Sequence, residues 1–393
     1  MREPNFARLC SLNAGIQLVW GAVLGISLQA RTIALSSPAE SVARYSALAA
    51  GGAIVATIVQ LLAGRLSDHS RARGSSRAKY HTLGTAIAVP ALVAFFLAPS
   101  FAALAIAFAC LQGGINIVLG AYQAIIPDYV GASRRGGASA WMSAFQSAGN
   151  AAGLLVAGLV RDGRIVATAL AAPLVITYAI ATGHARTLTP LPLREAGDLP
   201  RARGVLGALM LSRGLVNVGF FVLLDYLLFF VRDSLHVAAA RVELTTAFIF
   251  LTFTLAAIVG AVGAARPADR ADKRLVASVA VGSVALSLAG LAVATSVPMA
   301  FACAGIAGIG WGAFVTADWA LATAVLPARD MATAMGIWNV ATTLPQVVAP
   351  LIAGPLVVAA NATSLGAGPR SAIAAAIVAF VLGGIAIWRL PRV

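Results

Sequence analysis

Twelve apolar runs, each about the length of a membrane-crossing helix, follow one another along this chain. They lie at 9–30, 44–64, 81–98, 101–126, 138–160 and 165–183, and after a polar gap at 205–231, 242–265, 275–296, 299–326, 332–358 and 370–389. Because a helix needs about 20 apolar residues to cross a bilayer core of about 30 Å, each run predicts one span. We therefore expect an all-α membrane protein with two six-helix bundles, 1–183 and 205–393, joined by a cytoplasmic linker at 184–204.

The composition excludes most soluble alternatives. Hydrophobic residues make up 60% of the chain and charged residues only 11%, whereas an ordinary soluble domain is about 25% charged. In a soluble protein the net charge of +14 would indicate nucleic-acid binding. Here the charges lie in short gaps between apolar runs, so we expect the lipid bilayer, and no nucleic acid, as a partner.

The basic residues predict the orientation in the membrane. With the N-terminus in the cytoplasm, 20 of the 28 Lys and Arg residues fall on the inner side, 7 fall in outer loops, and Arg213 alone lies within a span. Cytoplasmic loops carry such an excess, so both termini are expected inside. The abundant Ala, and the use of Arg everywhere except Lys79 and Lys273, indicate a GC-rich bacterial genome and hence a multi-pass protein of a bacterial cell membrane.

The two halves look like copies of one another. Gln17 and Asn217 occupy matching positions, as do Pro127 and Pro327, and Gly158 and Gly354. Internal repeats of this kind are typical of transporters, whose substrate site lies between the halves near the bilayer midplane.

Three ionisable residues lie inside predicted spans, where a charge costs at least about 2.5–3.5 kcal/mol and is a functional candidate by default. Asp318 lies about 13 Å from the inner end of its span, with Trp311 two turns away and Trp319 beside it. A carboxylate next to aromatic rings suits a sugar, and a buried carboxyl also suits a proton carrier. The alternative is a structural acid bonded to a helix end or to Arg213.

The other two ionisable candidates share the seventh span. Asp225 lies about 10 Å below the outer face, as an outer-gate or proton-entry group or as a solvated acid. Arg213 lies about 18 Å along the helix from Asp225, too far for the two to pair. Its partner is either Asp318 or an anionic substrate, and otherwise it snorkels to the inner surface.

Neutral polar residues extend the candidate site. They are Gln17, Asn116, Asn217 and Asn339. Each is equally well explained as an interhelical hydrogen bond worth under about 1 kcal/mol.

The loop after the second run reads Gly64-Arg-Leu-Ser-Asp68-His-Ser-Arg71-Ala-Arg73-Gly74. It resembles the loop motif of the major facilitator superfamily, and in detail that of the glycoside/cation symporter and sucrose-transporter-like branch. Two further stretches are similar to the same branch: Ala124-Ile-Ile-Pro127-Asp128 with Arg135-Gly136, and Met335-Gly336-Ile-Trp338-Asn339 with Thr343-Leu-Pro345-Gln346.

The resemblance implies a fold and a gate. It implies the twelve-helix fold, a monomer, and a central cavity lined by spans one, four, seven and ten. It also implies a cytoplasmic gate in which Asp68 latches the inner ends of the halves, with Arg71 and Arg73 as latch partners or as anchors on anionic lipid. The gate residues carried over are Gly64, Asp68, Arg71, Arg73, Asp128, Arg135 and Asp269.

Departures from the family pattern argue against sodium coupling, against sucrose as the solute and against a drug/proton antiporter. The second span lacks the paired aspartates of sodium-coupled sugar symporters, Gln123 stands where sucrose transporters have Arg, and Leu154 stands where drug antiporters have proline. In the loop after the eighth span, Ala265 replaces the motif glycine.

The leading interpretation is a secondary active transporter that moves a small polar solute, with a sugar or glycoside as candidate class, by proton-coupled alternating access. The alternative is an efflux transporter that exports a drug or metabolite in exchange for protons. The chain has no P-loop, HExxH or GxSxG pattern, so we expect no enzyme, no cofactor and no metal site.

Overall fold

A computed structural model describes residues 3–37, 40–131, 134–191, 203–325, 331–364 and 366–390. The chain divides into two compact units, Met1–Glu195 and Ala196–Val393. Within the described residues the secondary structure is helical, without a β-strand.

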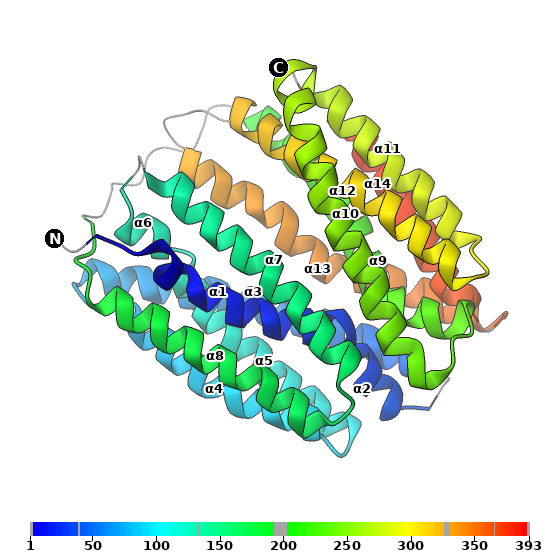
Figure 1. Cartoon of the computed structure of the whole chain (residues 1–393), viewed down its shortest axis with the longest axis horizontal. Coiled ribbons are helices and arrows are strands. Elements are labelled where there is room, and N and C mark those ends of the chain that lie inside the picture. The colour runs from blue at the N-terminus through cyan, green and yellow to red at the C-terminus, as the bar shows by residue number, and fades with distance from the viewer. Residues whose placement is uncertain are drawn as a thin grey trace. The chain divides into compact units, whose positions relative to one another are not determined.

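The first unit begins with α1 (Phe6–Ala22), which continues through a π-helical turn (Val23–Ser27) into α2 (Leu28–Ala34). The remaining helices are α3 (Ser41–Ala72), α4 (Ala78–Leu97), α5 (Phe101–Tyr122), the short α6 (Ile125–Tyr129), α7 (Arg135–Leu159) and α8 (Gly163–Arg186). Helices α1, α7 and α8 pack together, as do α3, α4 and α5, and α4 joins the two groups by packing on α8 (Figure 1).

The second unit begins with α9 (Arg203–Phe229), which ends in a π-helical turn (Phe230–Ser234). After a 3-10 turn (Ala239–Arg241) follow α10 (Val242–Arg270), α11 (Lys273–Ala292), α12 (Val297–Val325), α13 (Met331–Asn361) and α14 (Ala367–Ile387). Helix α12 packs on α10 and α11, and α9 packs on α13 and α14.

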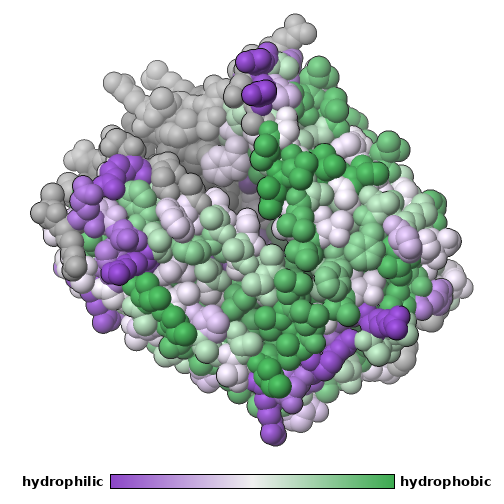
Figure 2. Space-filling model, viewed as in Figure 1, coloured by the Kyte–Doolittle hydropathy of each residue, from purple (hydrophilic) through white to green (hydrophobic). Residues whose placement is uncertain are grey.

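The helices confirm the predicted all-α membrane class. Among the described residues, eleven helices are long and apolar enough to cross a bilayer. Helix α7, at the predicted span 138–160, has 25 residues but carries Gln146, Asn150 and several Ser and Gly residues. Twelve spans therefore remain a prediction. Figure 2 shows apolar side chains over much of one face, and exposed Leu286 (77%), Val262 (73%) and Ile106 (68%) fit contact with lipid.

Glycines set the closest helix contacts. A Cβ atom on Gly153 of α7 would lie 2.1 Å from the carbonyl oxygen of Leu18 on α1, and one on Gly312 of α12 would lie 1.8 Å from that of Ala257 on α10. Lipid gives apolar helices no hydrophobic reason to associate, so small residues that permit close approach hold such pairs together. The spacing Gly149-x-x-x-Gly153 is therefore a packing feature of α1 and α7.

Candidate functional site

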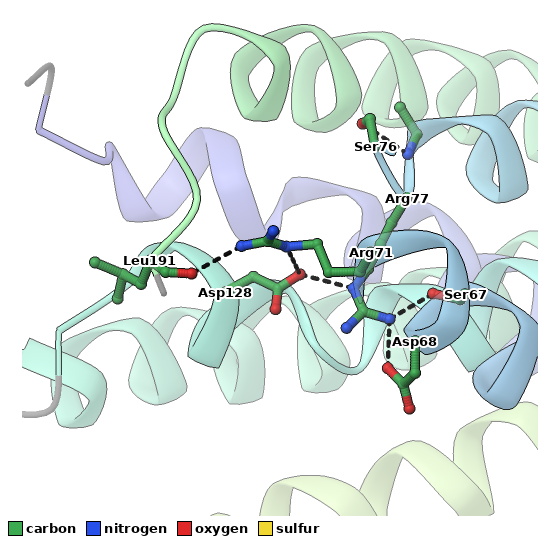
Figure 3. A network of polar contacts seen from close by, with 8 residues as sticks. Ser67, Asp68, Arg71, Ser76, Arg77, Asp128 and Leu191 are labelled. Atoms are coloured by element: carbon green, nitrogen blue, oxygen red, sulfur yellow. Dashed lines mark hydrogen bonds and ion pairs between the residues drawn. The ribbon is translucent and has the colours of Figure 1, made fainter. Parts of the chain in front are cut away.

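A network of charges joins the end of α3 to the start of α4 and to α6 (Figure 3). Arg77, the residue before α4, is its centre. Its Nε donates to Asp128 Oδ2 at 2.7 Å, and its Nη1 donates to Asp68 Oδ1 at 2.7 Å and to Ser67 Oγ at 2.5 Å. One guanidinium group thus links three elements through charge-assisted hydrogen bonds, which are the strong kind.

Burial separates the two carboxylates in this network. The side chains of Arg77 and Asp128 are 8% and 10% exposed, whereas that of Asp68 is 71% exposed. Burial by itself would lower the pKa of Arg77, but hydrogen bonds and charge from Asp128 and Asp68 outweigh it and raise the pKa above its usual value. The stabilising pair is therefore Arg77 with Asp128, while Asp68 is held at the solvent-exposed edge.

Arg71 extends the network to the segment that follows α8. Its Nη2 donates to the carbonyl oxygen of Leu191 at 2.7 Å, and its Nε lies 3.9 Å from Asp128 Oδ2. The backbone N–H of Leu191 donates in turn to the backbone oxygen of Asp128 at 2.7 Å. The start of the predicted linker is thereby fastened to the charge network, and the rest of it, at 192–202, lies outside the described residues.

The roles of Arg71 and Arg73 as latch partners or lipid anchors stay a prediction, but the structure gives Asp68 another partner. Asp68 pairs with Arg77, which we had not placed in the gate; Arg71 contacts Asp128 and Leu191, and Arg73 is exposed. The reason is Gly74, whose φ of +77° turns the chain after α3 and returns Arg77 to the helix end. In the sequence, the signal for this contact is that Gly74 precedes Arg77 by three residues. Gly64 lies where α3 crosses α5 at Gly120. The side chains of Arg135 and Asp269 are outside the described part.

A second charged site lies within the second unit. Arg213 on α9 and Asp318 on α12 form a direct ion pair between Nη1 and Oδ2, with side chains 11% and 3% exposed. Arg213 Nε also donates to Thr342 Oγ1 on α13 at 3.0 Å, and Asn217 Nδ2 donates to the backbone oxygen of Arg213 at 2.9 Å. Asp318 is therefore the partner of Arg213, one of the two alternatives that the sequence leaves open.

A cluster of aromatic rings lies about two helical turns from the ion pair. Trp311 of α12 stacks on Phe220 of α9 with centroids 4.3 Å apart and planes 14° apart. Phe220 follows Arg213 by seven residues on α9, whereas Trp311 precedes Asp318 by seven residues on α12. The ion pair and the ring stack can both form only if α9 and α12 run antiparallel in this register. Phe253, Phe314 and Phe380 surround Trp311 within 6.5 Å. One face of the indole is thus covered by Phe220, and a solute could stack only on the other.

The remaining sequence candidates belong to α9, to α13 and to the first unit. Asp225 is half-buried on α9, twelve residues beyond Arg213. Asn116 in the first unit is buried and donates to the backbone oxygen of Gln112 at 2.8 Å, and Gln17 is half-buried on α1. The side chain of Asn339 lies outside the described residues. No three His, Cys, Asp or Glu side chains in the described ranges are grouped to hold a metal ion.

Comparison with known proteins places this arrangement in a family. A family model described as Major Facilitator Superfamily matches residues 14–350. No curated protein sequence matches significantly.

Solved structures share the fold. A bacterial homologue of the human lysosomal transporter Spinster, in an inward-facing and occupied conformation, is 17% identical, with a TM-score of 0.73 over 98% of this chain and 94% of that one. A D-xylose-proton symporter is 14% identical, with a TM-score of 0.73 over 98% and 97%. The nucleoside transporter NupG is 14% identical, with a TM-score of 0.72 over 99% and 100%.

Proposed function

The chain belongs to the major facilitator superfamily, and from that premise we propose that it is a proton-coupled secondary transporter of a small polar solute, with a sugar or glycoside as candidate class. The superfamily consists of transporters and not of enzymes, so membership in it identifies the chain as a multi-pass membrane transporter. Coupling to protons, the class of solute, a monomeric state and a bacterial cell membrane are parts of the proposal.

The buried pair of Arg213 and Asp318 carries the proposal. Two charges this deeply buried are tolerated because each neutralises the other, and removing one partner leaves an uncompensated charge that costs about 3–5 kcal/mol. Protonation of Asp318 would remove one charge and release Arg213 from α12. A proton arriving at this carboxylate therefore changes a contact between α9 and α12, which is what coupling requires.

Groups around the pair suit a neutral hydroxylated solute. Thr342 contributes a hydroxyl that already accepts from Arg213, and Trp311 contributes an aromatic surface two turns away. Carboxylate, hydroxyl and guanidinium together offer both donors and acceptors to sugar hydroxyls. The D-xylose-proton symporter with the same fold is consistent with this class of solute.

The test is uptake driven by a pH jump in proteoliposomes, with a panel of sugars and glycosides. We expect a panel sugar to accumulate with the proton gradient, and Asp318→Asn to abolish accumulation while leaving solute exchange. The matched control is Asp233→Asn, which neutralises another buried, arginine-paired carboxylate of the same unit. The double variant Arg213→Gln/Asp318→Asn removes both charges and therefore leaves no unpaired charge buried. If only the single variant fails to fold, its loss of transport is caused by the unpaired Arg213 and not by the loss of a proton carrier.

Two results contradict the proposal. If no sugar or glycoside moves under any gradient, the solute class is wrong, and efflux of a drug or metabolite in exchange for protons becomes the working hypothesis. If Asp318→Asn still accumulates solute against its gradient, Asp318 does not carry the proton.

A further inference from the structure

An open groove of about 640 Å³ lies between the first turns of α4 and the last turn of α8. Helix α4 contributes Lys79, Thr82, Leu83 and Ala86, α8 contributes Arg186, and Ser76 lies at the rim. The two helices lie side by side (Figure 1). The groove adjoins the charge network, since its lining residues Ser76 and Ala78 flank Arg77, but Arg77 and its carboxylate partners do not line it.

The groove is basic at one end and apolar at the other. Lys79, Thr82, Leu83 and Ala86 follow the spacing of one helix face, which runs about 10 Å into the span from the helix start. Leu83, whose side chain is 52% exposed on α4, adds to the apolar end of the groove. This polarity matches an amphiphile that stands parallel to the helices.

The basic end of the groove carries two cations, Lys79 and Arg186. Lys79 lies over the ring of Tyr80 at 5.3 Å, and neither Lys79 nor Arg186 pairs with a carboxylate among the described residues. The nearby Asp68 and Asp128 are already engaged by Arg77. Two positive charges are therefore available to an anion at the end of the span that the charge distribution predicts to be cytoplasmic, where anionic lipid concentrates.

We propose that this groove binds one anionic phospholipid, with its phosphate between Lys79 and Arg186 and an acyl chain along Leu83 and Ala86. Basic residues above an apolar surface between two transmembrane helices are suited to such a headgroup. A soluble anion would use the basic end alone and gain nothing from the apolar floor. The site is independent of the solute that the protein transports.

Native mass spectrometry of the full chain in detergent, titrated with dioleoylphosphatidylglycerol, measures the first tightly bound lipid. We expect Lys79→Gln/Arg186→Gln to weaken this first binding by about tenfold or more, because each basic residue near an anionic headgroup contributes roughly a fivefold factor. Ala86→Trp fills the apolar floor and is expected to weaken it with both charges intact.

The control is Arg266→Gln/Lys273→Gln, which removes two cations from the same predicted membrane side of the second unit and gives the same net charge. It is expected to bind phosphatidylglycerol as the wild type does. A monodisperse elution profile and an unchanged helical circular dichroism spectrum establish that each variant is folded. If Lys79→Gln/Arg186→Gln is not folded, the lipid binding of Ala86→Trp decides whether the groove is the lipid site.

Three results overturn the proposal. One is an equal loss of lipid in the control double variant, which would mean diffuse attraction to a basic surface. Another is equal first binding of phosphatidylcholine, which would remove the role of charge. The third is displacement of phosphatidylglycerol by millimolar inorganic phosphate, which would make the groove a site for soluble anions.

Discussion

Arg77 is the residue whose removal should most disturb the first unit. Replacing it with Gln leaves the Asp128 carboxylate buried, with Arg71 as its remaining cation at 3.9 Å. Breaking a buried pair costs about 3–5 kcal/mol, and the distant second cation places the expected loss at the lower end, about 3 kcal/mol. Because the side chain of Asp68 is exposed, replacing it with Asn should lower the free energy of unfolding much less, since exposed ion pairs contribute about 0–1 kcal/mol.

The assay is reversible unfolding in mixed detergent micelles with increasing dodecyl sulfate, followed by circular dichroism. The series is wild type, Arg77→Gln, Asp68→Asn and Arg65→Gln. Arg65 is an exposed arginine of α3, so its replacement should change the free energy of unfolding by no more than about 0.5 kcal/mol. A loss in Asp68→Asn as large as that in Arg77→Gln would refute the ranking by burial.

Three further predictions concern helix packing, the ion pair and orientation. Gly153→Ala should lower the unfolding free energy by about 1–3 kcal/mol, because its Cβ would lie 2.1 Å from the Leu18 carbonyl oxygen. Gly113→Ala, in open space on α5, should instead raise it by up to about 1 kcal/mol in the same dodecyl sulfate titration. Neutralising Arg213 or Asp318 alone should cost about 3–5 kcal/mol in that titration, and the double variant less than the sum of the two; additive losses would mean no coupling. A cysteine at exposed Ser75 should react with an impermeant maleimide only in inverted membrane vesicles, and reaction in right-side-out vesicles would reverse the predicted orientation.

The sequence predicted the charged candidates better than their contacts. Arg213 and Asp318 were identifiable because a charge within an apolar run stands out, and helix depth excluded Asp225 as the partner of Arg213. The choice between Asp318 and a substrate remained open, because pairing depends on the register of α9 against α12. That register is visible only from the ion pair and the Phe220–Trp311 stack together.

The gate shows the opposite case. Its motif is recognisable in the sequence, but the sequence does not predict that Asp68 pairs with Arg77, because the turn at Gly74 brings Arg77 back over the end of α3. Spacing along a helix does not reveal contacts made across a turn. The link from Arg71 to Leu191 had no signal in the side-chain pattern, since its acceptor is a backbone carbonyl.

The sequence by itself determined the helical membrane class, because apolar length and the need to satisfy every backbone hydrogen bond in lipid leave few alternatives to helices. It also determined which residues were costly to bury. Tertiary structure alone decided which charges meet, which glycines are crossed by a neighbouring helix, and which basic residues have no carboxylate partner in the part of the chain that the structure describes. Those outcomes depend on the rotation and register of one helix against another, and hydropathy carries no information about either.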